Sequence, residues 1–316
     1  GDVYKRQQSA TPVREEPMIA DSSTSLDRAA DLRIEPGILD RLRAEEATRV
    51  IAVRDGRVRI SGADLDPATL LRVPASEIVD ATWALLGRDG DGTAVLLAVL
   101  PPEGDTVDTA PDEVWLGLRD LGARLGSGDT ELLIEALALG GWLRDAPFCP
   151  RCGGATELRQ AGWSRRCLVC GREHFPRTVP AVIVAVESSD GERLLLGANA
   201  NWGGRMYSCF AGFTEAGESL ESTVHRELEE ESGVRLASLR YVSSQPWPFP
   251  RSLMLGFRAV ALDDHVLRPD GEEIIDVRWF SRDEIGSALA GDGPVGLPGP
   301  ASIARALILE WFEERA

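Results

Sequence analysis

The stretch that decides the fold of this chain is Gly212-Phe-Thr-Glu-Ala-Gly-Glu218, followed after seven residues by Arg226-Glu-Leu-Glu-Glu-Glu-Ser-Gly-Val234. Its apolar residues recur at the spacing of one helix face: Leu220, Val224 and Leu228. This spacing predicts a helix over residues 219–232 that packs on a sheet through its apolar stripe, with a glycine close to each end. The many acids of the stretch then lie on the remaining faces of the helix.

Three of these acids are spaced for a metal site. Glu227 and Glu231 are four residues apart and therefore share one helix face, with Glu230 beside them. Like charges at this spacing destabilise a helix unless a cation compensates them. Hard oxygen ligands in this number suit Mg²⁺ or Mn²⁺, which can polarise a phosphoryl oxygen and lower the pKa of a bound water. The alternative is a solvated helix face without a ligand.

Here the resemblance to a known family becomes close. Residues 212–234 match the Nudix box, G-x5-E-x7-R-E-U-x-E-E-x-G-U with U an aliphatic residue, at every defined position. The resemblance implies hydrolysis of a nucleoside diphosphate derivative, with the catalytic metals bound by Glu227, Glu230 and Glu231. It also implies that Glu218 and Arg226 brace the loop of the box against the helix.

Two C-x-x-C pairs, separated by fourteen residues, precede this stretch: Cys149 with Cys152, and Cys167 with Cys170. Each pair forms a turn that can aim two sulfurs at one point, and Gly153 and Gly171 supply the backbone freedom that such turns need. The pattern predicts one structural zinc ion with four thiolate ligands. Redox-active or coincidental pairs are the alternative. The fifth cysteine, Cys209, has no partner motif and is interpreted as a core residue.

A proline-rich segment follows the box: Ser244-Gln-Pro-Trp-Pro-Phe-Pro-Arg-Ser252. Its three prolines predict a stiff, extended segment without donors for a sheet ladder. Trp247 and Phe249 could stack on a base, and Gln245 and Ser252 could hydrogen-bond to it. An ordinary edge loop with buried aromatic residues is the alternative.

The segment is similar to the S-Q-P-W-P-F-P-x-S signature of the NADH pyrophosphatase branch of the Nudix family, which also carries a zinc ribbon before the catalytic domain. This resemblance implies substrate contacts from Phe175, Phe213, Gln245, Pro246, Trp247, Pro248, Phe249, Pro250, Arg251, Ser252 and Ala304. It also implies two further metal ligands, Glu273 and the carbonyl oxygen of Ala211. For Ala304, simple packing is an equal alternative.

Two positions depart from this branch. Phe175 stands where relatives often carry tyrosine, so that a hydroxyl contact would be lost while stacking remains. Gly162 replaces an acidic residue that some relatives use near the substrate. Neither change touches the predicted metal ligands, but both leave open the preference between reduced and oxidised nicotinamide and between free and RNA-linked dinucleotide.

The whole chain is predicted to have an α/β (α+β) organisation in several parts. Residues 1–24 read as a disordered or artefactual leader, with Met18 a plausible start. An N-terminal α/β domain over 25–145 contains a hairpin at 50–60, a buried strand at 94–100 and a helix at 130–143. A zinc ribbon over 146–176 precedes a catalytic Nudix domain over 177–316, a mixed sheet flanked by helices.

Within the catalytic domain, the sequence predicts strands and helices on both sides of the box. The strands are expected at 181–186, 193–196, 239–243, 253–262 and 276–280. The last helix is expected at 301–314.

Composition excludes several classes of protein. The 316 residues carry a formal charge of −17, which argues against a broad basic surface for nucleic acid, although a small positive pocket stays possible. No run of eighteen apolar residues suggests a membrane span, and no signal peptide is visible. Cysteines in C-x-x-C pairs fit a reducing compartment, so a cytoplasmic location is expected.

The resulting hypothesis is hydrolysis of NADH or NAD⁺ to nicotinamide mononucleotide, reduced or oxidised, and AMP, with Mg²⁺ or Mn²⁺ in the active site and Zn²⁺ in the ribbon. Removal of the NAD cap from RNA would use the same chemistry. ADP-ribose is a more distant substrate, against which the W-P-F-P segment argues. A catalytically silent, nucleotide-sensing regulator is the alternative of another class, although such domains usually lose box glutamates. Family resemblance further implies a homodimer.

Overall fold

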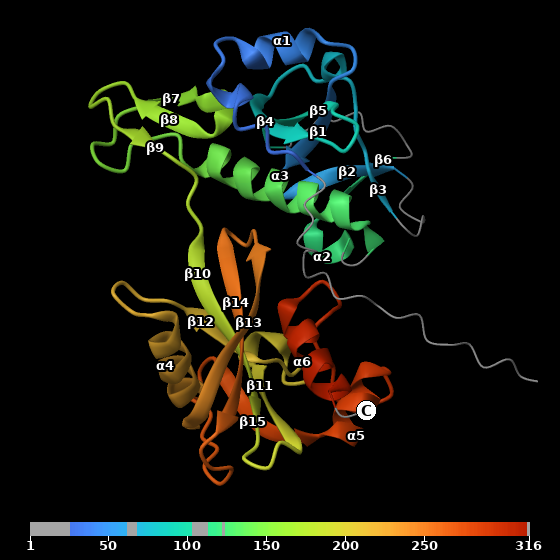
Figure 1. Ribbon diagram of the computed structural model, residues 1–316, viewed down its shortest axis with the longest axis vertical. Helices are drawn as coiled ribbons and strands as arrows, with labels where there is room; N and C mark the ends of the chain where they lie inside the picture. Colours follow the sequence, from blue (N-terminus) through green and yellow to red (C-terminus); the bar gives the residue numbers. More distant parts are fainter. Residues whose placement is uncertain (1–25, 62–67, 103–112, 122–123, 315–316) are drawn as a thin grey trace, which may run out of the picture.

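The structure is a computed structural model of the chain, and it describes residues 26–61, 68–102, 113–121 and 124–314. The predicted leader, residues 1–24, lies outside the described residues, and the predicted domain boundaries remain predictions. An N-terminal lobe and a C-terminal lobe lie one above the other, with a small ribbon beside the N-terminal lobe (Figure 1). In the described part of the chain, no helix has both the length and the apolar character to cross a membrane.

The N-terminal lobe is a mixed sheet of six strands with the order β3-β2-β1-β5-β4, in which β6 also pairs with β2. Its strands are β1 (Arg49–Arg54), β2 (Arg57–Ser61), β3 (Thr69–Leu70), β4 (Thr82–Arg88), β5 (Ala94–Val99) and β6 (Glu113–Leu116). Its helices are α1 (Ile38–Ala44), α2 (Leu118–Leu121) and α3 (Ser127–Asp145), with short 3-10 turns η1 (Leu32–Ile34) and η2 (Ala75–Glu77). Helix α3 packs on one face of the sheet and α1 on the other, so that each face has its own apolar core.

The three elements predicted for this lobe are confirmed. The hairpin of β1 and β2 turns at Asp55 and Gly56, which both have positive φ angles, 48° and 73°. Strand β5 is buried along its middle, and α3 extends the predicted helix by a few residues at each end. Local patterns were sufficient here, because β5 is a continuous apolar run buried on both faces of the sheet and the Asp-Gly turn marks the hairpin.

The zinc ribbon is a three-stranded sheet of β7 (Thr156–Arg159), β8 (Ser164–Cys167) and β9 (Glu173–His174), with the 3-10 turn η4 (Gln160–Gly162) after β7. It is fixed to the N-terminal lobe, because the indole nitrogen of Trp163 donates to the carbonyl oxygen of Leu85 at 2.7 Å. After β9 the chain runs as an extended linker into the C-terminal lobe (Figure 1).

The C-terminal lobe is built on a mixed sheet with the order β13-β14-β10-β11-β15, in which β12 also pairs with β10. The strands are β10 (Val179–Glu187), β11 (Arg193–Asn199), β12 (Phe210–Phe213), β13 (Leu236–Trp247), β14 (Ser252–Ala261) and β15 (Ile274–Ser281). The helices are α4 (Leu220–Ser232), α5 (Arg282–Leu289) and α6 (Ile303–Glu313), and η5 (Ala200–Trp202) is a 3-10 turn. Helix α4 covers one face of the sheet, and α5 and α6 cover the other (Figure 1).

The predicted helix of the box and the last helix are confirmed, whereas strand β12 was not predicted and other details differ. Strand β13 continues to Trp247, four residues beyond the predicted strand and into the segment that was predicted to be extended; it is an edge strand, where proline is tolerated. Helix α5 was not predicted. Its signal was present, because Ser281 and Glu284 form a reciprocal capping box at its start.

Candidate active site

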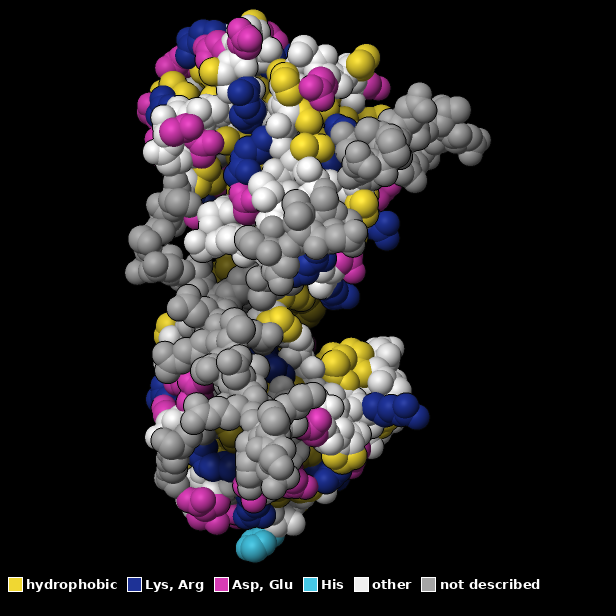
Figure 2. Space-filling view, turned by 90° about the vertical axis from the view of Figure 1, so that its right-hand side faces the viewer, with side chains coloured by type: hydrophobic (Ala, Val, Ile, Leu, Met, Phe, Trp, Pro, Cys, Tyr) yellow, Lys and Arg dark blue, Asp and Glu magenta, His cyan; other side chains and the backbone are white. Residues whose placement is uncertain are grey.

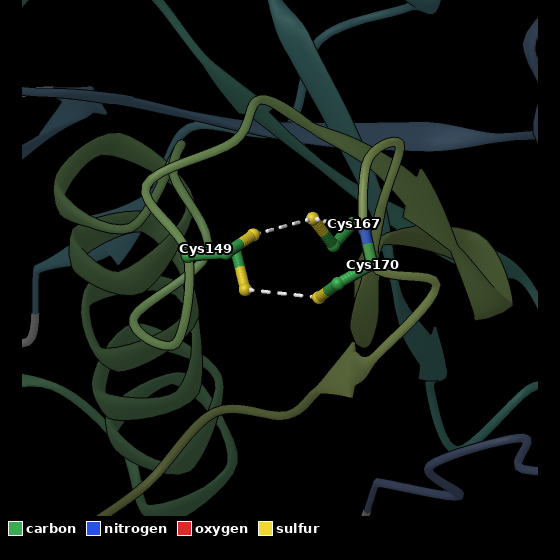
Figure 3. Close-up of side chains that lie close together, drawn as sticks. Cys149, Cys167 and Cys170 are labelled. Atoms are coloured by element: carbon green, nitrogen blue, oxygen red, sulfur yellow. Dashed lines mark hydrogen bonds between the residues drawn. The ribbon is translucent and has the colours of Figure 1, made fainter.

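The four cysteines of the ribbon converge on one point. The sulfurs of Cys149 and Cys170 lie 3.7 Å apart and those of Cys152 and Cys167 lie 3.5 Å apart, and all four lie within 4.8 Å of one another. Figure 3 shows the labelled cysteines turned toward one another from two loops. A tetrahedron with Zn–S bonds of about 2.3 Å has sulfur–sulfur edges of about 3.8 Å. The four thiolates therefore fit a structural zinc ion, with no ligand position left for water.

The turns of the ribbon explain this convergence. Gly153 and Gly171, directly after the two pairs, have φ angles of 72° and 69°, as the sequence predicted. Gly162 has a steric role in this chain. A Cβ atom there would lie 2.4 Å from Cβ of Ala84, and φ is 92°, so only glycine fits where the ribbon meets the N-terminal lobe.

Helix α4 holds the acids of the box in place. Ser219 caps its start by accepting a hydrogen bond from the backbone nitrogen of Ser222, and Gly233 ends it in a left-handed conformation. Val224 and Leu228 are completely buried against the sheet. This packing sets the helix rotation, and with it the direction in which the acids point.

Glu227 lies directly against β12. A Cβ atom added to Gly212 would lie 1.9 to 2.4 Å from the carboxylate atoms of Glu227. Because the glycine leaves this space, the carboxylate can lie over the backbone of the strand. The first glycine of the box therefore has a steric purpose.

Glu231 is the most deeply buried acid of the helix, with 5% of its surface exposed, and its Oε2 atom has no hydrogen-bond partner. Burial is the largest cause, and the negative charges of Glu227, Glu273, Asp270 and Glu230 add to it; together they raise the pKa of Glu231 to about 8. Burial also raises the pKa of Glu227. A buried, unpartnered carboxylate among other acids is the environment that a bound divalent cation would compensate.

Arg226 organises the exposed side of the same helix. Its guanidinium donates to both carboxylate oxygens of Glu218, at 2.7 and 2.8 Å, and to the carbonyl oxygen of Phe213 at 3.0 Å. It also contacts Glu227 at 2.9 Å and Glu230 at 3.2 Å. The hydrogen bonds from Arg226 hold the pKa of Glu218 at about 2, so this carboxylate stays ionised. The arginine thus links the loop of the box to the helix.

The other predicted metal ligands lie around this helix without forming a closed cluster. The side chain of Glu230 is 60% exposed, and Glu273 accepts a hydrogen bond from Asn199 at 3.2 Å. Ala211 lies in β12, paired with Ile183 of β10. Among the described residues, only the four cysteines bring three or more ligand atoms within 4.8 Å of one another. The carboxylates are more widely spaced, and Arg226 lies between several of them.

The residues of the segment from Gln245 to Ser252 differ in how far they are buried and in what they contact. Gln245 is buried, and its side-chain amide donates to the carbonyl oxygen of Ala301 and accepts from the backbone nitrogen of Ile303, both at 2.9 Å. Its amide therefore holds the start of α6. Ser252 is buried in β14, whereas Arg251 is exposed. Pro246, Pro248 and Pro250 complete the segment, and the bond between Phe249 and Pro250 is cis.

Trp247 and Phe249 form an edge-to-face pair with ring centroids 5.2 Å apart, and both pack against the core of the N-terminal lobe. Arg119 of α2 lies over the Phe249 ring at 4.6 Å and within 6.0 Å of the Trp247 ring. Sequence reasoning missed Arg119, and no motif surrounds it that could have singled it out. It also missed Asp270, which accepts backbone hydrogen bonds from residues 272–274.

Of the predicted substrate residues outside this segment, two expose their rings and one is buried. Phe213 is 53% exposed and Phe175 is 39% exposed, so both rings can contact a ligand. Ala304 is buried on the core side of α6, and its carbonyl oxygen lies 3.9 Å from the sulfur of Cys209. Cys209 is therefore a core residue, as predicted.

Comparison with protein families identifies two matches along the chain. Residues 177–297 match the NUDIX domain, and residues 144–175 match the NADH pyrophosphatase zinc ribbon domain. The two matches cover the four cysteines and the whole glutamate-rich stretch.

The chain is also similar to named relatives and to a solved structure. The chain is 39% identical over 279 residues to a Mycobacterium bovis protein named NAD-capped RNA hydrolase NudC, which covers 85% of each chain. It is 36% identical over 199 residues to the human NAD-capped RNA hydrolase NUDT12, covering 60% of this chain and 43% of the human protein. A Nudix hydrolase structure from Nitrosomonas europaea aligns with 53% of this chain and 91% of its own, at 24% identity and a TM-score of 0.40.

Proposed function

The chain belongs to the Nudix hydrolase family, and on that basis we propose that it hydrolyses the pyrophosphate bond of NADH and NAD⁺, giving nicotinamide mononucleotide, reduced or oxidised, and AMP. The observation that carries the proposal is the buried, unpartnered carboxylate of Glu231, one helix turn from Glu227, in a chain that also carries the zinc ribbon of NADH pyrophosphatases. Water adds to one phosphorus, the bridging P–O bond breaks, and the other phosphate leaves.

Mg²⁺ or Mn²⁺ would be held by Glu227, Glu230 and Glu231, with Glu273 and the carbonyl oxygen of Ala211 completing the site. The donor set fits, because all of these groups offer hard oxygen atoms and Glu231 lacks another partner. Such cations, when bound, polarise a phosphoryl oxygen, lower the pKa of water and neutralise the leaving phosphate.

The chain's own residues position the reacting groups. Arg226 and Glu218 fix the loop of the box against α4, which sets where Glu227 and Phe213 lie. One of the box carboxylates accepts the proton of the attacking water. Phe213 and Phe175 expose ring faces for a base or the nicotinamide, and Arg119 holds Trp247 and Phe249 against the N-terminal lobe.

NAD-capped RNA is the second substrate that we propose, because the relatives at 39% and 36% identity carry the name NAD-capped RNA hydrolase. The bond that is cut is the same. The formal charge of −17 argues against a broad basic surface for a long RNA, and the coloured part of the face in Figure 2 carries both basic and acidic side chains. We therefore expect the cap, rather than the RNA body, to supply most of the binding.

A homodimer in a reducing, cytoplasmic compartment completes the proposal, with the N-terminal lobe contributing to the interface. Size-exclusion chromatography with light scattering measures the mass directly. A mass of twice 34.2 kDa supports the dimer, and a mass of 34.2 kDa at all concentrations contradicts it.

Product analysis tests the activity. The purified protein is incubated with NADH, NAD⁺, ADP-ribose and an NAD-capped RNA, each with and without Mg²⁺ or Mn²⁺, and the products are separated by chromatography. Metal-dependent release of AMP and reduced nicotinamide mononucleotide from NADH supports the proposal. Faster cutting of the capped RNA makes RNA the main substrate. If no substrate is cut under any condition, the silent, nucleotide-sensing regulator replaces the enzyme.

A further inference from the structure

A histidine outside the four zinc ligands touches one of them. The Nε2 atom of His174 lies 3.1 Å from the sulfur of Cys149. His174 is in β9, where it pairs with Arg165 of β8, and its ring is half-buried beside the cluster. Two segments 25 residues apart in the chain therefore meet at this contact.

The direction of this hydrogen bond follows from the chemistry of the zinc site. A cysteine that binds zinc is a thiolate and carries no proton, so the imidazole must donate and the ring must carry its proton on Nε2. His174 is not a fifth zinc ligand, because four sulfurs already complete a tetrahedron. Among the described residues, the ligand atoms that all lie within 4.8 Å of one another belong to the four cysteines alone.

We infer that His174 is a positioning residue of the ribbon: its Nε2–H group donates a hydrogen bond to the Cys149 thiolate. This hydrogen bond helps the ribbon to retain its zinc ion. It also links the zinc site to the segment of chain that enters the catalytic lobe. The inference rests on zinc occupying the ribbon and is independent of which dinucleotide is hydrolysed. A donor to a thiolate withdraws part of its negative charge and fixes its orientation, which is the general role of groups around a metal's direct ligands.

The contact also has a place in the layout of the molecule. Phe175 directly follows His174, and after Pro176 the linker leads into β10, the central strand of the catalytic sheet. The hydrogen bond therefore fixes β9 at the point from which the exposed Phe175 ring projects. Loosening the zinc loosens the start of this linker.

Release of zinc tests the inference with a readout other than activity. The zinc-loaded full chain is mixed with excess chelating dye, and the rate of zinc transfer is followed by absorbance. His174→Leu, which keeps a similar bulk without a donor, should release zinc on the order of 10- to 100-fold faster. His174→Gln, whose side-chain amide can reach the same position, should stay within a few-fold of the parent chain.

His265→Ala is the matched control, because His265 is an exposed loop histidine of the C-terminal lobe. It should release zinc at the parent rate. Cobalt substitution adds a second readout, since the sulfur-to-cobalt absorption bands should shift in His174→Leu and return in His174→Gln. Equal release rates for His174→Leu and the parent would overturn the inference. Zinc release from His174→Gln as fast as from His174→Leu would also overturn it, because the shape of the imidazole ring, and not its N–H group, would then retain the zinc.

Discussion

At the scale of single residues, the carboxylate of Glu231 is held in a place that would be unfavourable without a counter-charge. It is 5% exposed, one oxygen has no partner, and four other acids raise its pKa. Burying an ion without a partner costs several kcal/mol in proteins. With its pKa raised to about 8, this group keeps a proton at neutral pH in the free chain, and a bound cation would stabilise its ionised form.

Glu231→Gln should therefore keep the fold and lose the chemistry. We expect kcat to fall by roughly 10²-fold or more while KM changes little, because the amide cannot bind a cation or accept a proton as the carboxylate does. Steady-state kinetics with NADH and saturating Mg²⁺ measures both constants, and the thermal melting curve checks folding. Turnover close to that of the parent would contradict the metal assignment.

Gly212→Ala tests whether the empty space beside β12 is needed. The new methyl group would occupy the position of the Glu227 carboxylate, which is the flexible end of a side chain and can move away. The chain should fold, and turnover should drop on the order of ten-fold or more because Glu227 is displaced. Gly141→Ala is the control, because nothing lies within 4 Å of the added carbon, and it should leave turnover unchanged. Similar kinetics for both variants would remove the steric role of Gly212.

At the scale of elements, helix α3 carries a glutamate, Glu135, whose buried surroundings disfavour its ionised form. Glu135 is buried in the N-terminal lobe, neither carboxylate oxygen accepts a hydrogen bond, and a guanidinium nitrogen of Arg28 is 3.5 Å away. Burial raises the pKa of Glu135 to about 7 from an ordinary value of 4.5, and Arg28 and Arg33 only partly oppose this.

The pH dependence follows from this shift. Between pH 4.5 and about 7 the folded chain keeps a proton on Glu135 that the unfolded chain has released, so the free energy of unfolding falls as pH rises through this range. Glu135→Gln should be more stable than the parent by on the order of 1–3 kcal/mol above pH 7, and equal to it near pH 4. Urea unfolding of both chains at several pH values measures the difference. A constant difference across pH would contradict the shift.

At the scale of the whole molecule, the two lobes meet through the proline-rich segment. Trp247 and Phe249 come from the catalytic lobe but pack against the core of the N-terminal lobe, with Arg119 over the Phe249 ring. In Figure 1 the tips of β13 and β14 point toward α3 and α2. The N-terminal lobe therefore shapes the segment that family resemblance assigns to the substrate.

Arg119→Ala should raise KM for NADH by roughly 2- to 30-fold, the range of a lost cation–π contact, with a smaller change in kcat. Arg119→Lys should restore part of the loss. Arg43→Ala is the control, because it removes a similar contact, 4.5 Å from the Trp83 ring, within the N-terminal lobe. If both alanine variants bind NADH alike, Arg119 does not position the segment.

Much of this protein follows from local spacing. The apolar stripe of α4, the glycines beside the cysteine pairs and the hairpin at Asp55 and Gly56 are all recognisable over fewer than fifteen residues, because each obeys the geometry of one helix, turn or strand pair. The same locality explains why the sequence by itself determined the family, the four zinc ligands and the face on which Glu227 and Glu231 lie.

Only the tertiary structure decided what these residues contact. Gln245 is held by residues 301 and 303, Gly162 packs on Ala84, and Arg119 lies over Phe249, so each contact joins segments more than 50 residues apart. The raised pKa of Glu231 likewise depends on burial in the packed lobe and on the charges of Glu273 and Asp270, which come from another loop. Periodicity and spacing describe one segment at a time, whereas burial and long-range contacts depend on which segments the packed core brings together.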